Sequence, residues 1–332
     1  MENTYPNILS GTGFADPAHY LKPAKLLLRD NLPRAGIHIH LYNAGLFPEF
    51  FEYLKDFPYP FDLFITVVDE KLESVLKNTF TAPAVPMLGK RTVLRVENRG
   101  RDVAPWVVDM APYQKDYDLF CHVHSKKSSQ YGPGEGDRWR KYLLDNLIAR
   151  DAVIDLFHLF QEDPKLGVVF PKLFSAVLRA HEYYGTPLEG EFGEPEMIEA
   201  LLRRMGFGQG YSRSDVMYSA GTMFWYRPRA LKALFDLHLK TEDFPEEPIG
   251  PGGTLAHAIE RIPAVVAERS GFHSGFFNEV EEDPASAVAK AAPAVSVNLM
   301  DAKEVAKRIG LQQALRICRE AAVLFLKKKT EG

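Results

Sequence analysis

The chain has 332 residues, of which 46% are hydrophobic and 25% are charged, and its formal net charge at neutral pH is −4. These values are typical of a globular protein and give no overall reason to expect a nucleic-acid partner. The two cysteines, Cys121 and Cys318, form neither a disulfide framework nor a CxxC metal motif. Because there is also no signal-peptide pattern and no apolar run of roughly 18 residues, we expect a cytoplasmic protein.

The first half of the chain predicts strands that alternate with helices. After a lead-in rich in proline, glycine and polar residues, strands are predicted at 36–42, 61–68, 92–96 and 117–123, and helices at 46–57, 69–80 and 105–113. This alternation is typical of an α/β fold with a parallel sheet. Loops at the carboxyl ends of such strands are the usual place for a ligand.

The second half of the chain is richer in helix. We predict one long helix or a helix pair at 138–160, a strand at 167–170, a helix at 189–205, a strand at 219–226, and helices at 228–239 and 255–261. The sequence therefore predicts a lead-in at 1–35, one α/β domain at 36–277, a linker rich in alanine and proline at 278–300, and a basic amphipathic helix at 301–332.

The loop after the predicted strand at 92–96 is the first candidate for ligand binding. It contains Asn98, Arg99, Gly100, Arg101 and Asp102. Gly100 permits a positive φ, which lets the backbone turn close to a ligand. The two arginines can hold a diphosphate through paired hydrogen bonds, and Asp102 can accept one from a ribose or sugar hydroxyl. The alternative is a turn whose surface ion pairs contribute little.

A second polar loop follows the predicted strand at 117–123. It contains His122, His124, Ser125, Lys126 and Lys127. Side chains alternate along a strand, so the two histidines project to one side, where they can bind a divalent metal such as Mg or Mn, or donate to a phosphate. The neighbouring lysines repel a cation and no third ligand stands at a fixed spacing, so phosphate binding is favoured. A buried histidine pair beside an exposed basic loop is the alternative.

Two further groups lie in the second half. Gly221 and Thr222 fall in the predicted strand at 219–226, where a glycine often marks the close approach of a ligand or backbone. The other group is acidic, with one histidine: Asp243, Glu246, Glu247, His257 and Glu260. A carboxylate in this group can act as the general base for a sugar hydroxyl. The alternative is a capped surface helix carrying an i,i+3 pair.

Several enzyme classes are excluded by missing motifs. The chain has no GxxxxGK[ST] loop, no GxSxG elbow and no GxGxxG after its first predicted strand. It is therefore not expected to be a P-loop kinase, an α/β-hydrolase or a simple NAD dehydrogenase.

Six blocks, taken together and in order, resemble the rhamnan synthesis protein F family of bacterial polysaccharide assembly. They are ENRGRDVAPW (97–106), YDLFCHVHSKKS (117–128), DRWRKYLLDNL (137–147), LGVVFP (166–171), SAGTMFWYRPRAL (219–231) and GTLAHAIERI (253–262). The resemblance implies a GT-A-like fold. It also implies a glycosyltransferase that moves rhamnose or another deoxyhexose from a nucleoside diphosphate sugar to a cell-surface polysaccharide or lipopolysaccharide O-chain.

The resemblance also implies roles for the candidate residues. The Asp-x-Asp motif by which such enzymes hold a metal is absent, and His122-Val123-His124 appears in its place. This departure puts metal dependence in doubt and favours cationic side chains at the leaving diphosphate, with an acid among Asp243, Glu246 and Glu247 as base. The basic helix at 301–332 can contact anionic lipid near a lipid-linked acceptor, at the inner face of the membrane.

Two other functions stay open from the sequence alone. One is a glycan-binding or scaffold protein that keeps the fold without transferring sugar. The other is a metal-dependent hydrolase that uses His122, His124 and His257.

Overall fold

The computed structural model describes residues 21, 27–28, 30–79, 84–125, 134–175, 194–208, 218–250 and 252–280. All of them belong to one compact unit, Met1–Glu282. The predicted linker beyond residue 280, the C-terminal helix, and Lys126 and Lys127 lie outside the described residues. The predicted domain boundaries stay predictions.

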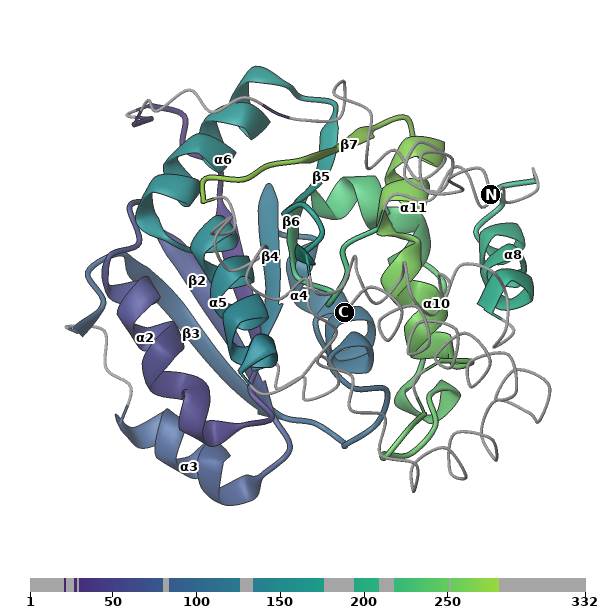
Figure 1. Ribbon diagram of the computed structural model, residues 1–332, viewed down its shortest axis with the longest axis horizontal. Helices are drawn as coiled ribbons and strands as arrows, with labels where there is room; N and C mark the ends of the chain where they lie inside the picture. The colour runs from purple at the N-terminus through teal and green to yellow at the C-terminus, as the bar shows by residue number, and fades with distance from the viewer. Residues whose placement is uncertain are drawn as a thin grey trace, which may run out of the picture. The chain divides into compact units, whose positions relative to one another are not determined.

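The described strands form one sheet in the order β3-β2-β1-β4-β6-β5-β7 (Figure 1). Their bounds are β1 (Ala35–His40), β2 (Phe61–Val67), β3 (Leu88–Arg95), β4 (Leu119–His124), β5 (Leu166–Phe170), β6 (Phe224–Tyr226) and β7 (His273–Phe276). Every pairing is parallel except those of β6, which runs antiparallel to both β4 and β5. The predicted mixed, mainly parallel sheet is confirmed.

Helices connect these strands and cover the sheet. Their bounds are α2 (Phe47–Lys55), α3 (Glu70–Thr79), a π-helical turn η4 (Pro105–Asp109), α4 (Ala111–Gln114), α5 (Glu135–Leu147), α6 (Arg150–Glu162), α8 (Glu194–Arg204), η7 (Pro228–Leu231), α9 (Lys232–Phe235), η8 (Thr241–Asp243), α10 (Leu255–Arg261) and α11 (Pro263–Arg269). In Figure 1, α2, α5 and α6 lie on the viewer's side of the sheet.

Alternation along β6 assigns the two faces of the sheet. The ring of Trp225 packs on Phe157 of α6, and its indole nitrogen donates to the carbonyl of Leu147 at the end of α5. Tyr226 points to the opposite face, where it contacts Trp106 of η4 and Phe235 of α9. Four of these side chains are buried and Phe235 is partly buried against them, so the core extends through both layers.

Several predicted elements differ in detail from the structure, and β3 begins at Leu88 where the strand was predicted to begin at 92. The predicted strand at 219–226 is a strand only at 224–226, because residues 219–222 form a turn with positive φ at Gly221 and Thr222. The predicted helix at 228–239 is the shorter pair η7 and α9, and the predicted helix at 105–113 begins as the π-helical turn η4. The segment at 138–160 is the helix pair α5 and α6, separated by the extended residue Ala149. The sequence analysis missed α11 and β7.

Candidate functional site

The sheet has a topological switch point between β1 and β4. The chain runs from β1 outward to β2 and β3, and then returns to place β4 on the other side of β1. Connections diverge at such a point, and ligands of open α/β sheets bind there at the carboxyl ends of the strands. His40 and His124 are register partners at these two ends. The structure thus places one predicted site residue, His124, at this edge of the sheet.

Ser125 ties the two strand ends together. Its backbone N–H donates to the carbonyl of His40 at 3.0 Å, and its hydroxyl accepts from the N–H of Asn43 at 2.8 Å. The residue is buried. Ser125, a predicted ligand-binding residue, is therefore engaged in holding the loop after β1 against the end of β4.

The loop after β3 has a left-handed backbone. Gly100 has φ 62° and Arg101 has φ 57°. A Cβ atom on Gly100 would lie 2.6 Å from the ring of Phe244, so this position needs glycine for space as well as for conformation. A left-handed non-glycine residue costs of order 1 kcal/mol and persists only where its surroundings hold it.

The segment at 244–250 holds this loop. The N–H of Arg101 donates to Oε1 of Glu247 at 2.9 Å, and the guanidinium of Arg101 donates to the carbonyl of Gly250 at 2.8 Å. Arg99 donates to the carbonyl of Phe244 and pairs with Glu246. These contacts join segments about 145 residues apart in sequence, and they bring the predicted arginines and two of the predicted acids together.

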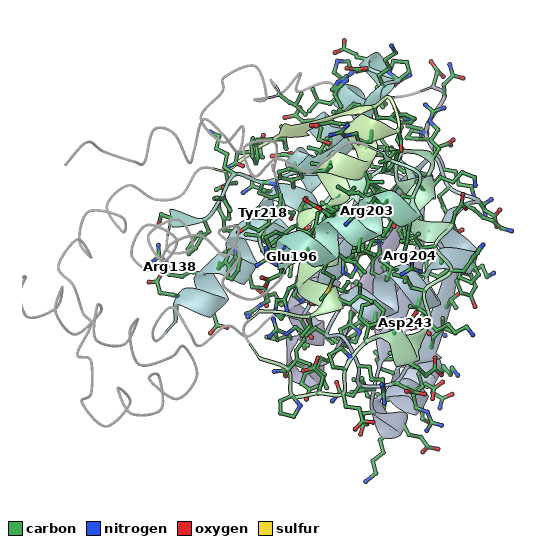
Figure 2. The ribbon with its side chains drawn as sticks, turned by 90° about the vertical axis from the view of Figure 1, so that its right-hand side faces the viewer. Arg138, Glu196, Arg203, Arg204, Tyr218 and Asp243 are labelled. Atoms are coloured by element: carbon green, nitrogen blue, oxygen red, sulfur yellow. The ribbon has the colours of Figure 1, made fainter. Side chains whose placement is uncertain are left out.

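The three predicted acids have different surroundings. Glu247 accepts from two backbone N–H groups, one on each oxygen, and so anchors the Arg101 loop. Asp243 accepts from the N–H of Lys240 at 2.8 Å and closes the turn η8, exposed at the surface (Figure 2). The Glu246 side chain is 79% exposed and its recorded partner is Arg99. Glu246 is therefore the acid most available to a ligand.

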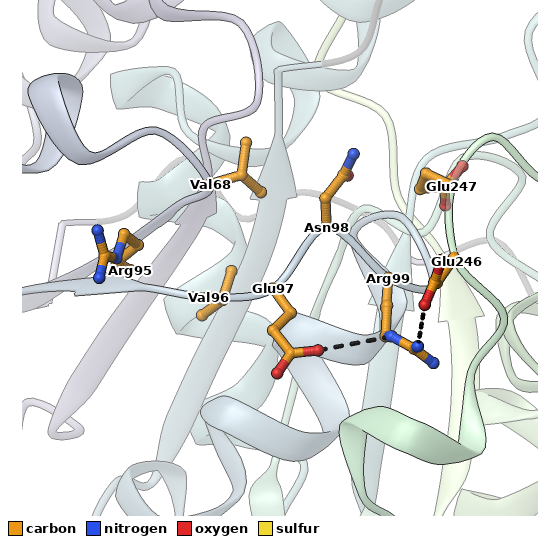
Figure 3. A pocket seen from close by; sticks show the side chains of 8 residues that line it. All are labelled: Val68, Arg95, Val96, Glu97, Asn98, Arg99, Glu246 and Glu247. Carbon is orange, nitrogen blue, oxygen red and sulfur yellow. Dashed lines mark hydrogen bonds and ion pairs between the residues drawn. The ribbon is translucent and has the colours of Figure 1, made fainter.

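An open pocket of about 620 Å³ lies between these segments. Figure 3 shows its lining, with Glu97 and Glu246 on either side of the Arg99 guanidinium. The lining residues are Val68, Arg95, Val96, Glu97, Asn98, Arg99, Glu246 and Glu247. The lining contains three glutamates and two arginines, so it does not carry a net positive charge. It offers many hydrogen-bond acceptors, which suit hydroxyl and amide donors better than phosphate.

Asp102 and the two predicted histidines lie together at the carboxyl end of β4. Nε2 of His122 and Nε2 of His124 are 3.5 Å and 3.6 Å from Oδ2 of Asp102. All three residues are buried. The expected shared side of the two histidines is confirmed, since their rings stack at 28° with centroids 6.0 Å apart.

The hydrogen bond of His124 shows which of its two ring nitrogens carries the hydrogen. Nε2 of His124 is 2.6 Å from the carbonyl oxygen of Gly221, which can only accept, so this nitrogen carries the hydrogen. A protonated nitrogen is not a metal ligand. Within the described ranges, no three or more side chains of His, Cys, Asp or Glu are arranged to hold a metal. In this arrangement His124 is a donor, and the described residues do not form the metal site of the hydrolase alternative.

Sequence reasoning missed two further histidines. His38 and His40 of β1 lie beside His122 and His124 of β4 in register, and they are buried on the same face of the sheet. Nδ1 of His38 is 2.9 Å from Nδ1 of His122. The signal was present in the sequence, since His-x-His occurs in both strands, but nothing in the sequence pairs them.

Burial keeps these imidazoles neutral. It lowers the pKa of His38 well below the usual 6.5, and that of His40 to about 3. Burial also lowers the pKa of His122, although the Asp102 carboxylate opposes this. At neutral pH these three rings are therefore uncharged and act through their N–H groups and lone pairs.

Gly221 and Thr222 form a turn at the edge of the site. The N–H of Gly221 donates to Oε1 of Glu260 at 2.8 Å, and its carbonyl accepts from His124. A Cβ atom on Gly221 would lie 3.1 Å from the Trp139 ring, and its φ is 90°. The predicted close backbone approach is therefore present, but the contacts recorded there come from protein side chains.

The predicted pair His257 and Glu260 lies on α10, which begins after Thr254 as expected. The Thr254 hydroxyl bonds to Nδ1 of His257 at 2.7 Å instead of to a backbone N–H. Burial lowers the pKa of His257 to about 4, with Glu260 opposing and Arg101 and Arg261 adding to the shift. Glu260 accepts from the N–H of Gly221, so α10 lies beside the turn at the edge of the site.

No helix in the described part of the chain combines the length and apolar character needed to cross a bilayer.

Known proteins that are similar to this chain align with it over only part of their own length. A mannosyltransferase from Pyrobaculum calidifontis, solved with GDP-Man and Mn²⁺, aligns with a TM-score of 0.44 and 12% identity over 86% of this chain and 66% of its own. Proteins named "Uncharacterized protein WxcX" from two strains of Xanthomonas campestris pv. campestris are 28% identical over 241 residues. That alignment covers 72% of this chain and 32% of theirs, so the chain spans about a third of the length of these curated relatives.

A family comparison covers most of the chain. The sequence model described as "Rhamnan synthesis protein F" matches residues 9–272, which include all six blocks on which the resemblance rests. The chain therefore belongs to the rhamnan synthesis protein F family.

Proposed function

We propose that the protein is a GT-A-like glycosyltransferase of polysaccharide synthesis. It moves rhamnose or another deoxyhexose from a nucleoside diphosphate sugar to a cell-surface polysaccharide or lipopolysaccharide O-chain. The observation that carries this proposal is the open pocket at the carboxyl end of β3, beside the switch point of the sheet, in a chain of the rhamnan synthesis protein F family.

The pocket suits the neutral, hydroxyl-rich parts of the donor. The carboxylate of Glu97 accepts from ribose or base donors, and the Asn98 amide can both donate and accept. Val68 and Val96 supply an apolar surface for a ring. We therefore assign the nucleoside to this pocket.

The diphosphate needs positive charge that the pocket lining does not supply. Arg101 is exposed in the loop after β3, and Lys126 and Lys127 directly follow Ser125 in the sequence. We assign diphosphate neutralisation to these three cations. Asp102 then orients a sugar hydroxyl of the donor.

The acceptor hydroxyl needs a base. Glu246 is the exposed acid, whereas Glu247 and Asp243 are engaged with backbone N–H groups. We assign deprotonation to Glu246 and the acceptor side to the turn at Gly221 and Thr222. The basic segment at 301–332 stays our candidate for contact with anionic lipid beside a lipid-linked acceptor.

The test is a donor panel on the full chain. Purified protein is incubated with dTDP-, GDP- and UDP-linked hexoses, with and without EDTA, and both binding and nucleoside diphosphate release are measured. Release that persists in EDTA supports cationic stabilisation, and release abolished by EDTA assigns that role to a divalent metal. Donor binding without release, with every acceptor tried, favours the scaffold function. Absence of binding to every donor refutes the proposal.

A further inference from the structure

The buried face of β1 and β4 carries an array of polar groups beneath the proposed donor site. His38 pairs with His122 in the sheet register, and His40 pairs with His124. Thr66 of β2 is the register partner of His40. His38, His122 and Thr66 have no exposed surface, so none of them meets a ligand directly. Their influence on a ligand has to pass through a neighbouring side chain.

These groups form one continuous hydrogen-bonded chain. Nδ1 of His40 is 2.9 Å from the Thr66 hydroxyl, which is 2.8 Å from Nε2 of His38. Nδ1 of His38 is 2.9 Å from Nδ1 of His122. Nε2 of His122 faces Oδ2 of Asp102 at 3.5 Å. The hydrogen-bonded chain thus runs from His40, at the carboxyl end of β1, to His122, whose Nε2 approaches the carboxylate of the residue that we assign to the donor sugar.

The Asp102 carboxylate determines which atom donates in each hydrogen bond of this chain. A neutral imidazole carries one N–H, so the two touching Nδ1 atoms must be one donor and one acceptor. If His122 donated from Nδ1, its Nε2 lone pair would face the Asp102 carboxylate, which is repulsive at 3.5 Å. His122 therefore carries its hydrogen on Nε2, and His38 donates to it from Nδ1.

The remaining hydrogens follow from this assignment. Nε2 of His38 is then an acceptor, so the Thr66 hydroxyl donates to it. The oxygen of that hydroxyl accepts from Nδ1–H of His40. Every donor points toward Asp102. The Thr66 hydroxyl donates its one hydrogen to His38 and accepts from His40, so it favours this pair of tautomers together with the carboxylate at the other end of the chain.

We propose that His38, Thr66 and His40 are positioning residues for Asp102, because they hold His122 in the Nε2–H tautomer that faces its carboxylate. The plane of the His122 ring is fixed independently by the Trp106 indole, which stacks on it at 17° with centroids 5.6 Å apart. With both plane and tautomer set, Asp102 keeps one orientation toward the donor. This inference rests on the proposed function only for what Asp102 binds.

The tautomers can be measured without any substrate. We expect the nitrogen NMR spectrum of histidine-labelled protein to show Nε2–H for His122 and Nδ1–H for His38 and His40, with assignments from single His→Gln variants. Thr66→Val keeps the shape of the side chain but removes the hydroxyl, and it should mix the tautomers of His38. Thr66→Ser keeps the hydroxyl and should restore them. A wild-type spectrum with Nδ1–H on His122 overturns the proposal, whether or not the protein is a transferase.

A double-mutant cycle that combines Thr66 and Asp102 variants measures whether the effect of Thr66 on activity depends on Asp102. We expect Thr66→Val to lower kcat/KM for nucleoside diphosphate release about tenfold, as loss of a supporting hydrogen bond does at other sites. Thr66→Ser should recover most of this loss. In an Asp102→Asn background, Thr66→Val should have no further effect. Full additivity would show that Thr66 acts only on the stability of the fold and would overturn the positioning role.

Discussion

The loop after β3 and the histidine face of β1 and β4 show two ways of holding polar groups. In the loop, Arg99 and Arg101 pair with acids and carbonyls at the surface, in water. On the histidine face, His38 and His122 are buried and neutral and meet each other directly. Exposed pairs are weak and exchange easily for a ligand, whereas a buried network is costly to rearrange. The loop is therefore suited to binding, and the histidine face to support.

This contrast predicts that low pH destabilises the two regions to different extents. The largest loss of folding stability should come from the histidine face. Each histidine of lowered pKa is neutral when folded, so the unfolded state binds more protons below its own pKa of about 6.5. Stability is complete above that pH and falls as pH decreases. Between pH 7 and 5.5, His40 alone should lower the free energy of unfolding by about 1 kcal/mol, and His38 and His122 add to this loss in the same direction.

The measurement is urea unfolding at several pH values. Asp102 and His124 face the same three rings, so the proton uptake belongs to the whole cluster. His38→Gln should reduce the acid slope, whereas His238→Gln, at an exposed position, should leave it unchanged. A free energy of unfolding that does not change down to pH 5 would contradict the account of buried neutral imidazoles.

The second prediction tests where the two regions meet. Asp102→Asn removes the charge that ends the histidine chain and, in our proposal, orients the donor. We expect kcat/KM for donor turnover to fall about 100-fold, in the range for loss of one well-placed polar group in an active site. The matched control is Asp116→Asn, an exposed aspartate outside the pocket lining. Equal activity of the two variants would remove Asp102 from the site.

The third prediction concerns the strained turn of the loop. Gly100→Ala places a methyl group 2.6 Å from the Phe244 ring at a φ of 62°, and should destabilise the protein by about 2 kcal/mol. Gly206→Ala is the control, since that glycine also has a positive φ but has no atom within 4 Å of its Cβ position. The control should lose about 1 kcal/mol, for the conformation alone. Equal losses would show that the contact with Phe244 does not matter.

The fourth prediction tests Glu246 as the base and has the smallest expected effect on stability. Glu246→Gln removes an exposed ion pair, so the free energy of unfolding should change by less than about 1 kcal/mol. Turnover should fall about tenfold or more if Glu246 is the base. Glu242→Gln, at a nearby exposed position, is the control for both measurements. Unchanged turnover in Glu246→Gln would reassign the base.

The sequence alone predicted most of the local structure. The alternation at 36–42 and the apolar run at 61–68 predicted the strands at 35–40 and 61–67 to within two residues, and both strands are buried on both faces of the sheet. Helical spacing did the same for α2 and α10. The family blocks also fall where the sheet ends, so the loop after β3 and the end of β4 were found before the fold was known.

The tertiary structure decided which of these pieces meet. Only the register of β1 against β4 shows that His38 touches His122. Only the return of the chain at 244–250 shows that Glu247 anchors the backbone at Arg101 while Glu246 stays exposed. Local propensity acts over a few residues, whereas these contacts join positions 84 and 146 residues apart. The physical reason is that packing and sheet pairing are non-local, and a sequence pattern records what each residue favours without recording its partner.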